Sequence, residues 1–241
     1  MGRKARRRLL PLVQELARVR PDVANPTEAV AAGEVFVDGR IVTNPASLVR
    51  LGASIVVRRA RPLRGEAKLR AALAAFDVRV RGRVTVDVGA AAGGFTRALL
   101  EAGAARVYAV DAGHGQLVGS LRADPRVVDL EGVNLAELDT TRIPEAIELV
   151  TLDLSYLSLA DAVPQLARLS IAGDAELVAL VKPAFELGLA ALPESPELLA
   201  RAIERARAGI DRSGWRVVAE LESPVRGARG AVEFLLHARR R

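Results

Sequence analysis

The segment from Val84 to Thr96 constrains the fold of this chain more than any other. It contains an apolar run and a glycine-rich turn, and a helix-like segment at 95–102 leaves the turn. A second apolar run, 106–110, ends at the carboxylate of Asp111, about 20 residues after the first glycine of the turn. In nucleotide-binding α/β folds an acidic residue at that spacing accepts hydrogen bonds from ribose hydroxyls. The pattern therefore predicts half of a nucleotide-binding α/β domain.

The middle of this turn narrows the class of ligand. Dinucleotide-binding turns have a glycine at the position of Ala91, so that the backbone can approach a pyrophosphate. The Cβ of Ala91 favours a ligand that carries an adenosine but no phosphates. S-adenosylmethionine is the leading candidate.

Apolar runs after the turn alternate with helix-like segments, which predicts a mostly parallel sheet covered by helices. Only residues 222–230 join the last two runs, too few for a crossover helix, so we expect this pair to be antiparallel. Seven strands with an antiparallel last pair resemble the Rossmann-like α/β fold of class I methyltransferases, not that of dehydrogenases. The expected strands are 84–88, 106–110, 126–130, 148–153, 175–181, 215–221 and 231–237.

The first 64 residues differ from the rest of the chain in charge. They hold 13 basic and five acidic residues, a net charge of +8, whereas the other 177 residues hold 22 and 24, a net charge of −2. A cationic module joined to a near-neutral one favours a nucleic-acid partner, although arginine is common throughout this chain.

Short elements predict that the N-terminal module is a small α+β domain. Helical segments are expected at 9–20 and 26–32, a hairpin at 35–42 with Asp38 and Gly39 in its turn, and a strand at 54–57. The expected organisation is an N-terminal domain over residues 1–59, a linker over 60–65 and a larger domain over 66–241.

Composition excludes several classes of protein. The chain has no cysteine, which excludes disulfides, zinc–thiolate sites and cysteine nucleophiles, and we expect no metal site. No apolar run approaches the roughly 20 residues needed to span a bilayer, and the basic N-terminus lacks a signal-peptide core. We therefore expect a cytoplasmic protein without a membrane partner.

Ligands of open α/β sheets bind beyond the carboxyl ends of the strands. Asp111 is expected to accept hydrogen bonds from both ribose hydroxyls. Glu131 or Asn134 would pair with the adenine edge, although an ordinary polar loop explains these two equally well. The loop residues expected to contact the rest of the cofactor are Asp87, Gly89, Ala90, Gly93, Gly94 and Phe95.

Lysine is scarce in this chain, and two lysines fall near the expected site. Only Lys4, Lys68 and Lys182 occur among 35 basic residues, so a lysine can mark a place that arginine cannot serve. Lys182 and Asp153 follow neighbouring strands and are costly to bury unless paired. Glu233 interrupts the last apolar run. Two lysines and two carboxylates could thus surround one oxygen.

Five ordered stretches resemble the FtsJ-type ribose 2′-O-methyltransferases, and more specifically the TlyA (haemolysin A-like) family of rRNA methyltransferases. They are Arg64–Leu69, Asp87–Thr96, Val107–Leu117, Asp153–Ser158 and Val181–Glu186. The resemblance implies a catalytic tetrad at Lys68, Asp153, Lys182 and Glu233. It also implies S-adenosylmethionine as cofactor and a cytidine of ribosomal RNA, free or in ribosomal subunits, as substrate.

The same family carries an N-terminal RNA-binding module of the kind first seen in ribosomal protein S-four, to which residues 32–42 are similar. In the implied reaction, Lys182, held by Asp153 and Glu233, would stabilise the developing alkoxide or act as the base. Lys68 would orient the 2′-hydroxyl. The sequence does not decide whether Lys182 stabilises the alkoxide or acts as the base.

Two other functions remain as alternatives. A small-molecule methyltransferase with a basic N-terminal module would keep its activity after removal of residues 1–60. An RNA-binding or haemolysin-like protein with an inactive methyltransferase domain would fail to bind S-adenosylmethionine.

Overall fold

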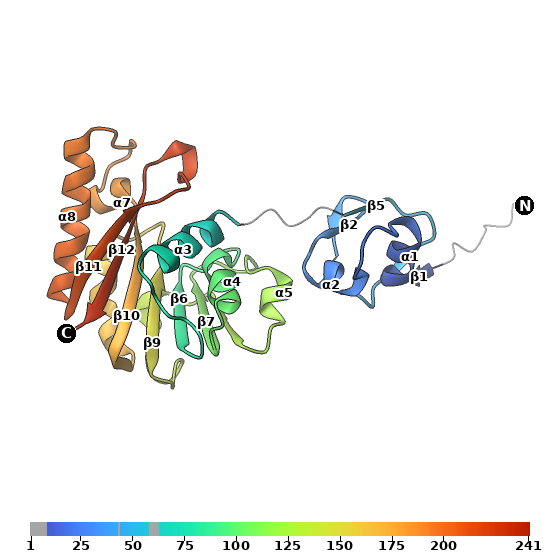
Figure 1. Cartoon of the computed structure of the whole chain (residues 1–241), viewed down its shortest axis with the longest axis horizontal. Helices are drawn as coiled ribbons and strands as arrows, with labels where there is room; N and C mark the ends of the chain where they lie inside the picture. The colour runs from blue at the N-terminus through green and yellow to red at the C-terminus, as the bar shows by residue number, and fades with distance from the viewer. Residues whose placement is uncertain (1–8, 43, 58–62) are drawn as a thin grey trace, which may run out of the picture. The chain divides into compact units, whose positions relative to one another are not determined.

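The computed structural model describes residues 9–42, 44–57 and 63–241 (Figure 1). The described residues form two compact units, a small N-terminal one and a larger one built on a seven-stranded sheet. Residues 60–62 of the expected linker, and Lys4, lie outside the described residues.

The N-terminal unit packs two helices against short strands around an aliphatic core. Leu12 and Leu16 of the first helix and Val30 of the second are fully buried in that core. Asp38 and Gly39 have φ values of 49° and 81°, which confirms the predicted hairpin turn. The elements of this unit are β1 (Leu9–Pro11), α1 (Leu12–Val19), α2 (Pro26–Ala31), β2 (Val35–Val37), β3 (Arg40–Ile41), β4 (Leu48–Arg50) and β5 (Ile55–Val57).

The first predicted helix is wrong at its start. Residues 9–11 form strand β1, which pairs antiparallel with β4, and α1 begins only at Leu12. Proline disfavours helical geometry in the residue before it, so Leu10 is extended, and Pro11 itself has a ψ of 133°.

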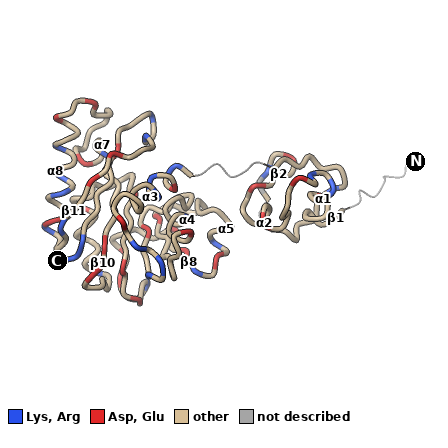
Figure 2. Tube along the Cα trace, viewed as in Figure 1, with Lys and Arg blue, Asp and Glu red and all other residues tan. Residues whose placement is uncertain are grey.

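The compact part of this unit is not basic, although residues 1–64 as a whole carry the excess positive charge. Residues 9–57 contain four arginines and five acidic residues, which Figure 2 shows interspersed. Arg18 pairs with Glu15, and Arg20 pairs with Asp22. The excess positive charge comes from residues 1–8 and 58–64, most of which lie outside the described residues.

The larger unit has the predicted class I methyltransferase topology. Its strand order is β11-β12-β10-β9-β6-β7-β8, and β12 runs antiparallel to both β10 and β11 while the others are parallel. The strands are β6 (Val84–Val88), β7 (Arg106–Asp111), β8 (Val127–Glu131), β9 (Ile147–Leu152), β10 (Ile171–Val181), β11 (Trp215–Glu222) and β12 (Phe234–Arg240). The sheet therefore brings the ends of β6, β9 and β10 side by side.

Helices connect these strands, and α3 packs against α4 while α6 and α7 pack against α8. The α-helices are α3 (Arg64–Ala75), α4 (Gly94–Glu101), α5 (Gly119–Arg122), α6 (Leu159–Ala162), α7 (Pro183–Leu187) and α8 (Pro196–Arg212). Three 3₁₀ helices, Leu135–Glu137, Val163–Arg168 and Ala228–Gly230, complete the described elements. Within the described ranges, none of the helices has the length and apolar character needed to cross a membrane.

The last strand begins later than predicted. It was expected over 231–237, but β12 starts at Phe234, and Glu233 lies just before it. The preceding loop closes on itself, because the Gly227 amide donates to the Ala231 carbonyl at 2.8 Å and Arg229 has a φ of 56°. The apolar run alone could not reveal where this loop ends.

Candidate active site

The glycine-rich turn after β6 brings segments of the protein's own backbone very close together. Gly89 has a φ of +87°, and a Cβ there would lie 2.4 Å from the Asp153 carbonyl oxygen. A Cβ on Gly94 would lie 2.9 Å from the Glu66 amide nitrogen at the start of α3. These two glycines thus permit the turn to pass against neighbouring segments, a role that the sequence interpretation missed. Their predicted contact with the cofactor stays a prediction.

Asp87 lies beneath the turn and not on its surface. Its side chain is fully buried and accepts hydrogen bonds from the hydroxyls of Thr96 (2.7 Å) and Thr151 (3.0 Å). Burial raises the pKa of Asp87 to about 7, although the two threonine hydroxyls oppose this shift. The carboxyl of Asp87 therefore ties β6 to α4 and β9, and any effect on a cofactor would pass through the turn.

Asp111, at the end of β7, shapes the same turn from the other side. Its two carboxylate oxygens accept hydrogen bonds from the amides of Ala91 (2.8 Å) and Gly113 (2.7 Å). Ala91 has a φ of +44°, a left-handed conformation that is uncommon for alanine. Each carboxylate oxygen can accept a second hydrogen bond, so Asp111 can still serve a ribose hydroxyl.

The other two predicted cofactor residues are engaged with protein groups. The Glu131 carboxylate accepts hydrogen bonds from the amides of Gln116 (2.5 Å) and Leu117 (2.9 Å) and so holds the loop that follows β7. The Asn134 side-chain amide is 3.3 Å from the Glu137 carboxylate. Pairing of Glu131 or Asn134 with an adenine edge stays a prediction.

A small cavity of about 160 Å³ lies between the turn and the start of α3. Four of the predicted cofactor residues line it, together with Asp153. Its lining is Leu63, Arg64, Gly65, Gly89, Ala90, Ala91, Ala92, Gly94, Phe95 and Asp153. This set of backbone amides and small side chains fits a compact zwitterionic group, such as the methionine part of S-adenosylmethionine.

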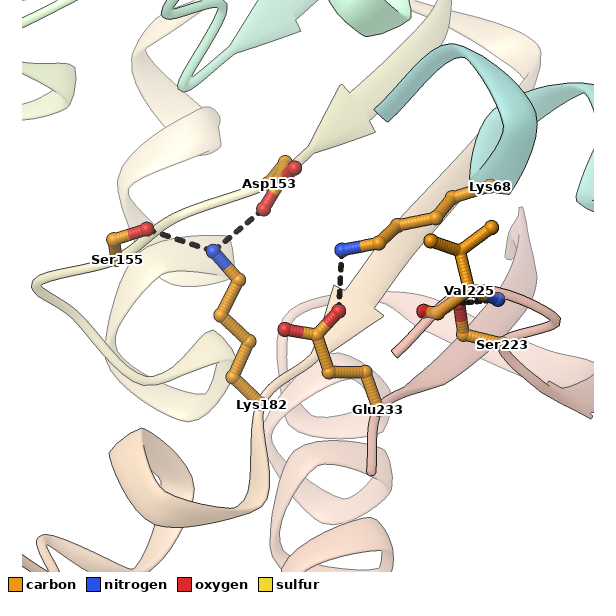
Figure 3. Close-up of polar contacts among 7 residues, drawn as sticks. All are labelled: Lys68, Asp153, Ser155, Lys182, Ser223, Val225 and Glu233. Atoms are coloured by element: carbon orange, nitrogen blue, oxygen red, sulfur yellow. Dashed lines mark hydrogen bonds and ion pairs between the residues drawn. The ribbon is translucent and has the colours of Figure 1, made fainter. Parts of the chain in front are cut away.

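Lys182 and Asp153 form one ion pair of the site (Figure 3). Asp153 follows β9 and Lys182 follows β10, and because these strands are parallel neighbours the two side chains meet. The Lys182 Nζ lies 2.6 Å from Asp153 Oδ1 and donates a hydrogen bond to the Ser155 hydroxyl at 2.7 Å. The Lys182 and Asp153 side chains are 15% and 21% exposed, so reactants can reach this pair.

Lys68 and Glu233 form the second ion pair, which joins α3 to the segment before β12. Their side chains are only 7% and 5% exposed. This pairing corrects the expectation that Glu233 would hold Lys182, because the Glu233 carboxylate is bonded to Lys68 and the partners of Lys182 are Asp153 and Ser155. The structure nevertheless gathers all four tetrad residues in one place, as Figure 3 shows.

A second cavity of about 330 Å³ opens beside the two lysines. Lys68, Lys182, Glu233 and Ser155 form its polar end, and its other walls are mainly apolar. Those walls consist of Pro183, Ala184, Phe185, Leu189, Ala190, Leu192, Pro193, Ala228, Arg229, Ala231 and Val232. Asp153 lines the small cavity and Lys182 lines this one, so their ion pair connects the two cavities.

Two residues of this site escaped the sequence interpretation. Ser155 lies two residues after Asp153, a position that could have suggested a role. Gly227 gave no signal, but a Cβ there would lie 2.1 Å from the Glu233 carboxylate. No group of three or more candidate metal-binding side chains occurs in the described part of the chain.

Comparison with known proteins gives sequence matches that cover most of the chain. The model of the family described as FtsJ-like methyltransferase matches residues 62–240. The 16S/23S rRNA (cytidine-2′-O)-methyltransferase TlyA of Mycobacterium tuberculosis is 40% identical over 99% of this chain and 91% of its own length.

Solved structures agree with the fold. A candidate hemolysin from Streptococcus thermophilus is 30% identical, covers 96% of this chain and 88% of its own, and has a TM-score of 0.70. The magnesium protoporphyrin IX methyltransferase of Synechocystis, solved with bound S-adenosylhomocysteine, covers 73% of this chain and 84% of its own. At 20% identity and a TM-score of 0.51, it supports the fold alone.

Proposed function

The chain belongs to the FtsJ-like methyltransferase family, and on that premise we propose that it methylates a ribose 2′-oxygen of ribosomal RNA. The observation that carries this proposal is the ion pair between Lys182 and Asp153. It lies between the small cavity beside the glycine-rich turn and the second cavity beside the two lysines. The cofactor is S-adenosylmethionine, which supplies a methyl group already activated as a sulfonium.

The turn after β6 and the carboxylate of Asp111 are the groups that would hold this cofactor. Asp111 retains acceptor capacity for a ribose hydroxyl, and the amides of the turn suit a carboxylate. The small side chains of Ala90 and Ala91 leave room close to the backbone, where a bulkier residue would fill the cavity.

Lys182 is the residue that acts on the acceptor oxygen. Its ammonium group is held by Asp153 and Ser155, so it is a hydrogen-bond donor that can stabilise negative charge on a 2′-oxygen. This environment favours the electrostatic role over that of a base. The oxygen–methyl bond forms as the sulfur–methyl bond breaks, and the hydroxyl proton leaves to solvent. Lys68, buried against Glu233, would orient the hydroxyl.

Two exposed aromatic side chains support an RNA substrate. Tyr156 and Phe185 are 53% and 44% exposed, and they follow Asp153 and Lys182 closely in the sequence. Bases of single-stranded RNA stack on such side chains. The arginines in 1–8 and 58–64 would add contacts to phosphates. A ribosomal RNA substrate, free or in an assembled subunit, also agrees with a cytoplasmic protein.

Transfer of a labelled methyl group tests this proposal. We expect the full-length chain to label isolated ribosomal subunits or free rRNA, and treatment of the RNA with ribonuclease to release the label. If calorimetry shows binding of S-adenosylmethionine but neither RNA substrate is labelled, the chain is a small-molecule methyltransferase. Absence of cofactor binding would instead support an inactive methyltransferase domain.

A further inference from the structure

Glu186 is a buried carboxylate that the proposed reaction does not use. It lies on α7, the helix that begins directly after Lys182, and only 2% of the residue is exposed. Its backbone amide donates to the Lys182 carbonyl at 3.1 Å. Glu186 is therefore held close to one member of the reactive ion pair.

The side chain of Glu186 reaches the segment that carries the other member of that pair. Its Oε1 accepts a hydrogen bond from the Leu159 amide, the first residue of α6, at 2.6 Å. The loop between β9 and α6 contains both partners of Lys182, namely Asp153 and Ser155. Its start is anchored by the Asp153 amide, which donates to the Val88 carbonyl at 3.0 Å. Glu186 anchors its end.

Capping of α6 alone does not account for Glu186. The Ser158 hydroxyl already accepts a hydrogen bond from the Asp161 amide and caps this short helix. α8 packs so closely on α6 that a Cβ on Gly209 would lie 2.3 Å from the Ala160 Cα, so this end of α6 cannot shift toward α8 without a clash.

The second oxygen of Glu186 is buried and accepts no hydrogen bond among the described residues. Burial raises the pKa of Glu186 to about 7, although the amides of Leu159 and Ala160 oppose this shift. Burial of such a polar group destabilises the folded protein, so its presence indicates a function. A link between two segments is one such function.

We propose that Glu186 is a positioning residue that links the start of α6 to the helix after Lys182 and thereby holds Asp153 and Ser155 against the Lys182 ammonium. The part of this inference that concerns catalysis rests on the proposed function. The link itself can be tested without any methyl transfer.

Lysine labelling tests the link directly, because the chain contains only three lysines. We would treat the full-length protein with trace acetic anhydride and measure acetylation of Lys182 relative to Lys68 by mass spectrometry. Glu186→Ala should raise this ratio roughly five-fold, as expected when about 1 kcal/mol of ion pairing is lost. Glu186→Gln keeps an acceptor for the Leu159 amide and should stay within about two-fold of the wild-type ratio.

A matched control separates this effect from general loosening. Glu176→Ala removes a buried glutamate from β10, six residues before Lys182 in the sequence, and should leave the ratio unchanged. If Glu186→Ala does not fold, Glu186→Asp, which is too short to reach Leu159, replaces it. An unchanged ratio in the folded variant, or an equal rise in Glu176→Ala, would overturn the proposal.

Steady-state kinetics of the Glu186 variants test whether this link affects the methylation reaction. Glu186→Ala should lower kcat for RNA methylation about ten-fold or more while the KM for S-adenosylmethionine changes little, because misplaced reacting groups slow the chemical step. Glu186→Gln should restore most of kcat. Equal losses in both variants would contradict positioning through the Leu159 hydrogen bond. An inactive wild type would refute the proposed function, whereas the labelling ratio would still decide on Glu186.

Discussion

The two lysine–carboxylate pairs of the site have the same chemistry but different surroundings. The Lys68–Glu233 pair is almost completely buried and joins segments 165 residues apart in the sequence. The Lys182–Asp153 pair is about three times more exposed and joins the ends of neighbouring strands. Removal of one partner from a buried ion pair strongly destabilises a protein, whereas an accessible ion pair can contact reactants. We infer that the first pair mainly holds the site together and that the second does the chemistry.

The largest expected effect comes from the accessible pair. Lys182→Ala should reduce methyl transfer about 10³-fold, within the range typical of a positioned catalytic side chain, with only a small change in melting temperature. Lys182→Arg should also lose most activity, because a planar guanidinium cannot replace a compact ammonium between Asp153 and Ser155. Near-wild-type activity in both variants would exclude Lys182 from catalysis.

The buried pair should dominate stability. Lys68→Met leaves the Glu233 carboxylate buried without its partner and should cost about 3–5 kcal/mol of unfolding free energy. The double variant with Glu233→Leu should regain most of this loss, because an apolar pair of similar size avoids the uncompensated charge. Urea unfolding measures both values. If Asp153→Asn destabilises the protein as much as Lys68→Met, the two pairs do not differ as we infer.

Asp87 allows a further test of how burial affects a carboxyl group, because its partners are threonine hydroxyls and not a lysine. The pKa of Asp87 is raised to about 7 in the folded protein, from a usual value of 3.8. The folded state therefore binds this proton more tightly, and its contribution to stability, on the order of a few kcal/mol, is lost as the pH rises through 7. Urea unfolding of wild type and Asp87→Asn from pH 4 to 8 should show the wild type losing stability relative to the variant. A pH-independent difference would refute the raised pKa.

The smallest expected effect concerns Gly227, which makes room for Glu233. Gly227→Ala should displace the Glu233 carboxylate and cost about 1–3 kcal/mol, as overpacking of a closely packed site does. Gly173→Ala is the control, because nothing lies within 4 Å of the added Cβ, and it should change stability by less than about 0.5 kcal/mol. Equal unfolding midpoints for the two variants would show that the space beside Glu233 is not tightly packed.

Local patterns in the sequence predict the sheet well and the contacts of the site less well. The strand beginning at Val84 is confirmed to the residue, since an apolar run bounded by glycine has clear ends. The predicted onset of β12 is wrong because Ala231 and Val232, at the end of the loop, extend the apolar run of the strand. The four tetrad side chains come together as predicted, but the sequence carries no signal that Glu233 pairs with Lys68 and not with Lys182. Such pairing depends on how far α3 lies from the start of β12, which only the folded chain defines.

The measurement that tests the central claim most directly is the chemical identity of the product. After incubation of ribosomal RNA with the full-length chain and S-adenosylmethionine, the RNA would be digested to nucleosides and analysed by mass spectrometry. We predict 2′-O-methylcytidine and a block to alkaline cleavage at the modified position, because that cleavage needs a free 2′-hydroxyl. A methyl group on a base, or unmodified RNA after incubation with protein that binds the cofactor, would contradict a ribose 2′-O-methyltransferase.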